Sequence, residues 1–181
     1  MALCEKILIA GFSGAGKTSF LKEIEKTAPA GWERFDDLDE LVLKNRGEGH
    51  KNLAGLIQEV GWEKFRLWER QELEGWLKES GKGVLALGGG ALSLMVWELY
   101  KNSKKVQFCY LKADFEDCWE RLTRVGEEAR PMVMKGEDEL RLIYNEREAI
   151  FSQIPWKITN FQNDNLKAQV RLFWENGILR S

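Results

Sequence analysis

The chain has 181 residues, enough for one domain with a single sizeable core, and its 44% hydrophobic and 31% charged content is that of a soluble globular protein. Its formal net charge of −2 provides no basic field to hold a phosphodiester backbone, which argues against nucleic acid as the main partner. No stretch approaches the roughly 20 apolar residues that a membrane span needs, and no signal peptide fits before the first expected strand, so a cytoplasmic protein is expected.

The first predicted strand, Lys6–Ala10, leads into a glycine-rich loop. Its apolar, β-branched residues suit a buried parallel strand, and apolar residues recur at helical spacing after the loop, over Phe20–Lys26. Between them, Gly11–Ser19 reads GFSGAGKTS, with the P-loop spacing of glycine, four residues, glycine, lysine and Ser or Thr. A glycine-rich turn that matches by chance is the alternative, but strand, loop and helix stand in the order that the motif requires.

A P-loop binds the phosphates of ATP or GTP, and each residue type in it has a physical reason. Glycines let successive backbone N–H groups approach an anion, and the positive end of the following helix dipole points at the same place. Lys17 is expected to bridge the β- and γ-phosphates, and the Thr18 hydroxyl is expected to complete a Mg²⁺ shell. The residues expected to contact the nucleotide are Gly14, Ala15, Gly16, Lys17, Thr18 and Ser19.

A short second strand, Glu33–Phe35, is expected to deliver the acidic run Asp36–Asp39 to the sheet edge where ligands bind. The alternative is an acidic helix start, since Asp favours N-cap and first-turn positions, and both interpretations can hold together. Many P-loop enzymes place a magnesium-directing aspartate after a later strand, but the next buried strand, Lys82–Leu87, ends in glycines. Asp37 is therefore the candidate for that acid.

Helices fill the segment between these two strands. The predicted helices are Leu41–Asn45 with a stop at Gly47, Leu53–Val60, and Gly61 to about Ser80. On the last of them, Arg66 and Glu69 lie three residues apart on one face, a pattern that taken alone is most often a solvated ion pair.

Three glycines, Gly88, Gly89 and Gly90, follow the strand Lys82–Leu87, where they allow close approach of backbone to a ligand or form a flexible turn. The later predicted elements are a helix at Ala91–Tyr100, a strand at Lys105–Leu111, a helix at Asp114–Arg124, a polar stretch at Val125–Gly136, a helix at Glu137–Ile150, a strand at Pro155–Thr159 and a closing helix to about Asn176. The polar stretch, broken by glycine and proline, is typical of a mobile lid, which in kinases excludes water and can bring an arginine, here Arg130, to the transferring phosphate. The alternation of strands and helices predicts an α/β fold with a parallel sheet covered on both faces.

Histidine and cysteine offer little chemistry. His50 is the sole histidine and sits in a polar stretch, which favours a solvated loop position. Cys4, Cys109 and Cys118 are odd in number and lack paired metal-type spacing, which favours reduced thiols.

The order and spacing of these candidates resemble the shikimate kinase family over Lys6–Thr159. The matching features are GFSGAGKT, Asp37 with Asp39, Phe65-Arg66 with Glu69, the triple glycine, Arg130-Pro131, and Arg147 before Ile150-Phe151. The resemblance implies a P-loop kinase fold with a central five-stranded parallel sheet in one domain, 1–181, with a substrate-binding helical segment at about 40–80 and a mobile lid at about 125–136. It also implies transfer of the γ-phosphate of ATP, with Mg²⁺, to the 3-hydroxyl of shikimate in chorismate biosynthesis.

By the same resemblance, each candidate residue acquires a role. Lys17, Asp39 and Arg130 are expected at the catalytic centre, with Asp39 as orienter first and base second. Thr18 and Asp37 are expected to hold the metal. Arg124 is expected to lie on the adenine, although both Arg124 and the alternative, Arg121, match the adenine-side arginine of the family only with a shift of register. The residues expected to bind the acceptor are Asp39, Arg66, Gly88, Gly89, Gly90, Arg130 and Arg147. Guanidinium donors and an acidic acceptor suit the carboxylate and hydroxyls of a small hydroxy acid.

Several positions depart from the family pattern. Leu21 and Lys22 stand where the family usually has glycine and arginine, and Ala149 and Phe151 where it usually has proline and tyrosine. A divergent member, acting as a monomer, is expected. Two alternatives stay open from the sequence: a related kinase with gluconate or a nucleotide as acceptor, and a non-catalytic nucleotide-binding relative.

Overall fold

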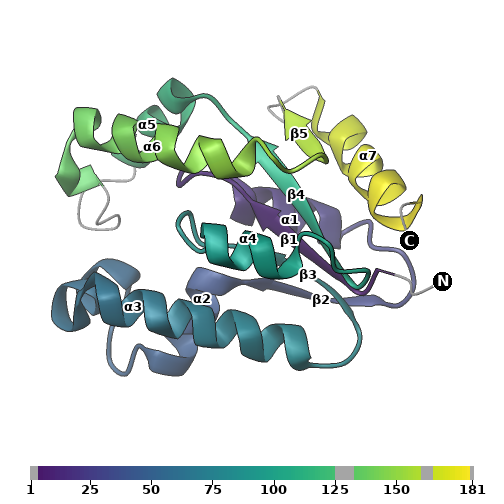
Figure 1. Cartoon of the computed structure of the whole chain (residues 1–181), viewed down its shortest axis with the longest axis horizontal. Coiled ribbons are helices and arrows are strands. Elements are labelled where there is room, and N and C mark those ends of the chain that lie inside the picture. Colours follow the sequence, from purple (N-terminus) through teal and green to yellow (C-terminus); the bar gives the residue numbers. More distant parts are fainter. Residues whose placement is uncertain (1–3, 125–132, 160–164, 180–181) are drawn as a thin grey trace.

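The computed structural model describes residues 4–124, 133–159 and 165–179. Its centre is a sheet of five strands in the order β2-β3-β1-β4-β5, and every pairing in it is parallel. The strands are β1 Lys6–Ala10, β2 Trp32–Asp37, β3 Lys82–Ala86, β4 Val106–Lys112 and β5 Lys157–Thr159 (Figure 1). The predicted α/β fold with a five-stranded parallel sheet is confirmed.

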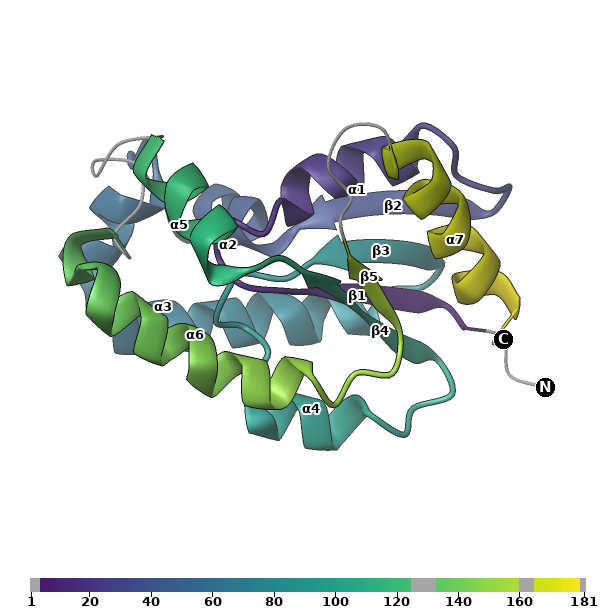
Figure 2. The ribbon, with the colours of Figure 1, turned by 90° about the horizontal axis from the view of Figure 1, so that it is seen from above.

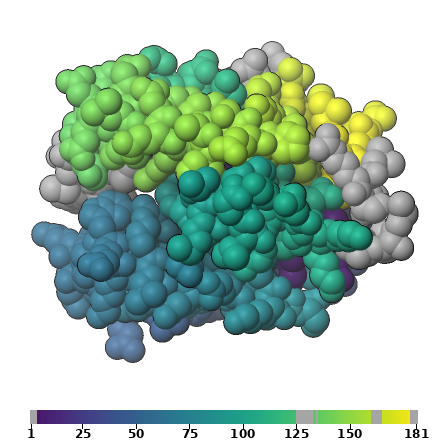
Figure 3. All heavy atoms as spheres, viewed as in Figure 1, coloured from purple at the N-terminus to yellow at the C-terminus, as the bar shows by residue number. Residues whose placement is uncertain are grey.

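Helices cover both faces of this sheet. The helices are α1 Lys17–Glu25, α2 Leu38–Arg46, α3 Leu53–Lys78, α4 Leu94–Tyr100, α5 Phe115–Arg124, α6 Glu137–Phe151 and α7 Leu166–Leu179, with a 3₁₀ turn, η2, at Val133–Lys135. Seen from above, α1 and α7 lie on one side of the sheet and α3, α4 and α6 on the other (Figure 2). In the space-filling view, α6 lies along the upper edge, with α4 and α3 below it (Figure 3). No helix within the described ranges has both the length and the apolar character to cross a membrane.

The alternation of side chains along β1 explains the two layers. Ile7 and Ile9 point into the core shared with α1 and α7, whereas Leu8 and Ala10 point into the core on the opposite face. All four are fully buried, as expected for a central strand of a parallel sheet. A third, smaller core joins α2 to α3 and consists of Val42, Leu56, Ile57 and Phe65.

The helices between β2 and β3 follow the sequence prediction closely. α2 ends at Gly47, and the long helix α3 contains one residue with non-helical dihedral angles, Gly61, at φ 81° and ψ 159°. This backbone region is essentially restricted to glycine. The chain therefore forms two helical segments that meet at Gly61, as predicted.

Several predicted boundaries were wrong by one to three residues, and a local cause can be named for two of them. The helix expected from Ala91 begins at Leu94, because the side chain of Ser93 accepts a hydrogen bond from the Val96 N–H at 3.3 Å and caps the helix there. The strand expected from Pro155 begins at Lys157. Proline has no N–H to join a ladder, which accounts for the later start.

The chain order places candidate residues at one edge of the sheet. The glycine-rich loop follows β1, the acidic run overlaps the end of β2, and the triple glycine follows β3. These three strands are neighbours, so their carboxyl ends lie together. The connections from β1 and from β3 leave in opposite directions across the sheet, which is where open α/β sheets bind ligands.

Candidate active site

The glycine-rich loop is closed over the ammonium group of its own lysine. Gly16, at φ 91°, is the N-cap of α1. Lys17 is buried, and its Nζ donates hydrogen bonds to the carbonyl oxygens of Gly11 at 2.8 Å and Phe12 at 2.9 Å. Burial lowers the pKa of Lys17, while the nearby carboxylates of Asp39 and Asp37 act in the opposite direction. The loop therefore has a buried cation and a helix N-terminus, the two features that favour bound phosphate.

Asp37 serves as a helix cap and as a partner of the loop. One carboxylate oxygen accepts from the Asp39 N–H at 3.0 Å and caps α2, and the other accepts from the Thr18 hydroxyl at 2.6 Å. The two interpretations of this acidic run, helix start and ligand edge, hold together. A hydroxyl and a carboxylate oxygen beside a phosphate-binding loop suit Mg²⁺, which prefers hard oxygen ligands and keeps water and phosphate oxygens in its shell. Within the described residues, no cluster of three or more His, Cys, Asp or Glu side chains could hold a metal by itself.

The triple glycine forms a surface against which side chains from several elements converge. A Cβ on Gly88 would clash with Glu69 Oε1 and lie 2.5 Å from Asp39 Oδ1. A Cβ on Gly90 would lie 2.5 Å from Arg66 Nη2 and 2.9 Å from Arg147 Nη2. Only the missing side chains of these glycines leave room for the groups around them.

Gly89 connects this surface to the phosphate loop. A Cβ on Gly89 would clash with the Ser13 hydroxyl and lie 2.8 Å from the Ser13 backbone nitrogen. The structure therefore places Asp39 from α2, Arg66 from α3 and Arg147 from α6 around one glycine turn that touches the P-loop.

Arg66 and Glu69 form a partly buried pair, so the interpretation as a solvated ion pair does not apply here. Arg66 Nη1 donates to Glu69 Oε2 at 2.5 Å, and the Glu69 side chain is only 2% exposed. Burial raises the pKa of Glu69, and the charge and hydrogen bond of Arg66 oppose that rise. Glu69 Oε1 is buried and has no hydrogen-bond partner among the described residues.

Arg147 is the second guanidinium at the turn. Burial lowers its pKa to about 10, and the charge of Arg66 acts in the same direction. Its Cζ lies 5.4 Å from the centroid of the Phe12 ring, and its Nη1 is buried with no hydrogen-bond partner in the described part of the chain. Two neighbouring guanidinium groups with unused donors form a strong site for a planar anion.

Asp39 has the most perturbed carboxylate of the group. Its pKa is raised to about 7, first by burial and then by the charges of Asp37 and Glu69, whereas Lys17 and Arg66 lower it. A carboxylate with a pKa near neutrality is suited to accept a proton or to hold a hydroxyl group.

Two tyrosines fix α6, the helix that carries Arg147, and the sequence alone gave no reason to single them out. The Tyr144 hydroxyl donates to the carbonyl oxygen of Ala113 at 3.0 Å, and the Tyr110 hydroxyl donates to Glu148 in a short hydrogen bond. The Tyr144 and Glu148 positions are four apart on α6, a spacing that marks one helix face but not what that face contacts.

The remaining candidates are spread more widely. Arg121 Nη1 donates to the carbonyl oxygen of Gly14 at 3.0 Å, so this arginine lies on the P-loop. Arg124, the arginine preferred for the adenine from the sequence, is 72% exposed and pairs with Glu120 at 2.5 Å. Ser19 is exposed on α1. Arg130 and residues 125–132 of the expected lid lie outside the described residues.

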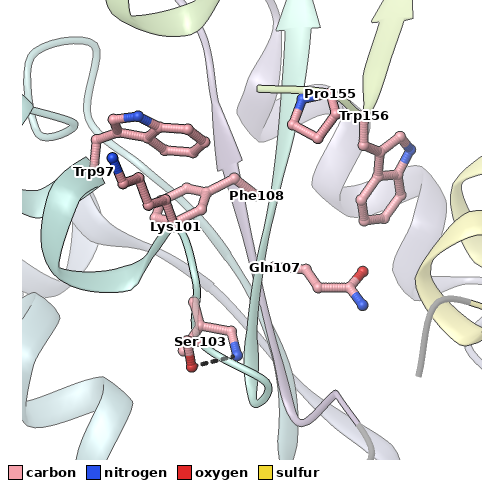
Figure 4. Close-up of a pocket in the computed structure, with 8 residues that line it drawn as sticks. Trp97, Lys101, Ser103, Gln107, Phe108, Pro155 and Trp156 are labelled. Carbon is pink, nitrogen blue, oxygen red and sulfur yellow. Dashed lines mark hydrogen bonds between the residues drawn. The ribbon is translucent and has the colours of Figure 1, made fainter. Parts of the chain in front are cut away.

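A cavity of about 180 Å³ lies at the other end of β4, beside its first residues (Figure 4). It is lined by Trp97, Lys101, Ser103, Val106, Gln107, Phe108, Pro155 and Trp156. None of the candidate site residues lines this cavity, so it is separate from the glycine turn.

Comparisons with known proteins converge on one family. The family model described as shikimate kinase matches residues 13–174 of the chain. The shikimate kinase of Helicobacter hepaticus is 32% identical over 151 residues, which cover 82% of each chain. The shikimate kinase of Clostridium botulinum is 28% identical over 161 residues, which cover 88% of this chain and 90% of that one.

Solved structures show the same fold. A shikimate kinase from Acinetobacter baumannii, in complex with shikimate, superposes with a TM-score of 0.78 at 22% identity, over 97% of this chain and 96% of that one. A shikimate kinase from Bacteroides thetaiotaomicron gives a TM-score of 0.73 at 24% identity, over 94% of this chain and 97% of that one.

Proposed function

This chain belongs to the shikimate kinase family, a family of ATP-dependent phosphotransferases, and we propose that Arg66 and Arg147 hold the carboxylate of shikimate while Asp39 holds its 3-hydroxyl beside the P-loop. The observation that carries this assignment is the convergence of both guanidinium groups on Gly90, one turn from the loop that binds phosphate. A planar carboxylate accepts two parallel N–H donors, so a pair of fixed guanidinium groups orients as well as binds the acceptor.

Asp39 and Glu69 supply the acceptors that the hydroxyl groups of shikimate need. Both carboxylates border Gly88, and Glu69 Oε1 has an unused acceptor there. A hydroxyl that donates to Asp39 is oriented for attack, and Asp39 then takes the proton as the new P–O bond forms. The reaction in full joins the 3-oxygen of shikimate to the γ-phosphorus, breaks the bond between that phosphorus and the β–γ bridging oxygen, and releases ADP.

Lys17 supplies charge neutralisation in this scheme. In the structure its ammonium donates to the carbonyls of Gly11 and Phe12, and the phosphate oxygens of a bound nucleotide would replace those carbonyls as partners. Phosphoryl transfer depends mainly on alignment and on stabilising charge on the transferred group, so this cation acts where charge develops.

Thr18 and Asp37 are the residues that would hold Mg²⁺. Their side-chain oxygens lie 2.6 Å apart, directly beside the phosphate loop. When bound, the ion neutralises charge on the β- and γ-phosphates.

Two arginines complete the assignment. Arg121, through its contact with the Gly14 carbonyl, is the residue that we assign to the nucleotide side of the loop. Arg130 keeps its expected role at the transferring phosphate.

The test is a coupled assay of ADP release by the purified protein with ATP, Mg²⁺ and shikimate, with shikimate 3-phosphate identified by mass spectrometry. Turnover with shikimate, and none with gluconate or with nucleotide monophosphates, supports the proposal. If ADP is released with another acceptor at millimolar concentration but not with shikimate, that acceptor is the substrate and the proposal for shikimate is wrong. Binding of ATP without transfer to any acceptor would refute the catalytic assignment altogether.

A further inference from the structure

The guanidinium group of Arg66 is held from more than one direction. In its plane, Nη1 donates to Glu69 and Nη2 faces Gly90. Its Cζ lies over the ring of Trp62, 5.1 Å from the ring centroid, and over the ring of Phe65, 5.4 Å from that centroid. An aromatic ring attracts a cation through its face and uses none of the N–H donors, so the indole can hold Arg66 without competing for the carboxylate of the acceptor.

The break at Gly61 brings Trp62 to this position. The non-helical dihedral angles of Gly61 end one helical segment, and the next begins at Trp62. Trp62 and Arg66 are then four residues apart, which places them on the same face of the new helix.

The indole of Trp62 is itself well supported. Trp62 packs both against the core beneath α3, α4 and α6 and against the smaller core between α2 and α3. Its ring also meets Phe65 edge to face, with centroids 6.1 Å apart and an interplanar angle of 87°. A ring fixed between two cores is a rigid support for a flexible arginine side chain, whose rotamer entropy is large.

We propose that Trp62 is a positioning residue for the acceptor carboxylate: it fixes Arg66 in the orientation in which Nη2 faces Gly90 and Arg147. This inference rests on the proposed function, because it assigns to Arg66 a substrate carboxylate. Without the indole, the described contacts of the guanidinium that remain are the hydrogen bond to Glu69 and the Phe65 ring, whose centroid lies 5.4 Å from Arg66 Cζ. We infer that the guanidinium then leaves more often the orientation in which Nη2 faces Gly90.

The test compares Trp62→Leu, which removes the aromatic face, with Trp62→Phe, which keeps one. We expect the KM and the directly measured Kd for shikimate to rise about three- to tenfold in Trp62→Leu, with the KM for ATP changed by less than about twofold. Trp62→Phe should retain most of the wild-type affinity. Equal losses in the two variants would mean that the tryptophan acts by packing alone and would overturn the proposal.

Trp68→Leu is the matched control. Trp68 lies on the same helix, is also partly buried, and holds a cation in the same way, with Lys64 Nζ at 5.0 Å from its ring centroid. Lys64 is exposed, and no candidate site residue other than Arg66 has a described ring contact with Trp62 or Trp68. We expect Trp68→Leu to leave the KM for shikimate unchanged, and an equal rise in both Leu variants would refute a specific role for Trp62.

A double variant separates the positioning of Arg66 from a general effect of Trp62→Leu on packing. In an Arg66→Met background, Trp62→Leu should cause no further loss of shikimate affinity, because the group that Trp62 positions is gone. Additive losses would overturn the inference. If the wild type phosphorylates shikimate and Trp62→Leu has wild-type kinetics, the inference fails alone; if the wild type has no turnover with shikimate, the proposed function fails and takes the inference with it.

Discussion

Adding a single methyl group at Gly90 tests whether the acceptor site lies at the glycine turn. The Cβ of Gly90→Ala would lie 2.5 Å from Arg66 Nη2 and 2.9 Å from Arg147 Nη2, whereas ordinary contacts of this kind begin at 3.4 Å. The nearer guanidinium must therefore move by about 1 Å. A misplacement of that size costs on the order of 100-fold in rate, which corresponds to about 2.7 kcal/mol of transition-state stabilisation.

The kinetic signature distinguishes the acceptor site from the nucleotide site. We expect Gly90→Ala to lower kcat/KM for shikimate about 100-fold while the Kd for ATP, measured by calorimetry, stays within about twofold. Gly89→Ala should instead weaken the binding of ATP, because the new Cβ would clash with Ser13 in the P-loop. Gly75→Ala, near the C-terminal end of α3 with open space around its Cβ, is the control and should change neither constant. A kcat/KM for shikimate within twofold of wild type in Gly90→Ala would refute the convergence of the two arginines on the substrate.

Three further predictions concern Arg121, Asp39 and Gly61. Arg121→Ala should raise the KM for ATP roughly tenfold through loss of the contact with the P-loop, whereas Arg124→Ala, which removes an exposed ion pair, should leave it unchanged. The pKa of Asp39 is raised to about 7, so the folded state still binds a proton at pH values where the unfolded state has lost it. This contribution to stability is present at about pH 4 and is lost as the pH rises through about 7. In urea unfolding of the protein without nucleotide, Asp39→Asn should therefore gain stability relative to wild type as the pH rises over that range. Gly61→Ala should lower the free energy of unfolding by about 1–3 kcal/mol in urea titrations, because its dihedral angles are those that alanine avoids.

Each of these has an outcome that would contradict it. Equal ATP constants in the two arginine variants would remove Arg121 from the nucleotide site. A difference in stability between wild type and Asp39→Asn that is constant with pH would show that Asp39 titrates at its ordinary pKa. For Gly61, the control is again Gly75→Ala: a Cβ meets open space at both positions, so equal stability of the two variants would show that the backbone conformation at Gly61 carries no cost.

The parts of this protein that sequence predicted well are those whose physics is local. The P-loop is defined by consecutive residues, and the stop at Gly47 and the break at Gly61 each follow from what glycine does to a helix. The parallel sheet with helices on both faces was predictable because alternating strands and helices leave few arrangements, whereas the order of the strands was not predicted.

What sequence could not supply depends on contacts between distant elements. The burial of Glu69 depends on how closely α3 approaches the turn after β3, and a spacing of three on a helix carries no information about that distance. The choice between Arg121 and Arg124 is of the same kind, since it depends on which turn of α5 packs against Gly14, a contact set by three-dimensional packing. Tyr110 on β4 contacts Glu148 of α6, and Tyr144 of α6 contacts the loop residue Ala113, so each hydrogen bond joins segments that are far apart in the sequence.

The unused hydrogen-bonding atoms of the site offer a final argument for its chemistry. Buried polar atoms without partners are rare because each costs roughly 1–3 kcal/mol, and a cluster of them calls for an explanation. Six buried side-chain atoms lack a partner within the described residues, and two of them, the donor Arg147 Nη1 and the acceptor Glu69 Oε1, belong to residues that border the triple glycine. A molecule that carries a carboxylate at one end and hydroxyl groups at the other would satisfy the donor with its anion and the acceptor with its hydroxyls. Under the proposed assignment, a bound hydroxy acid supplies the partners that these two atoms lack, and those hydrogen bonds contribute to its affinity.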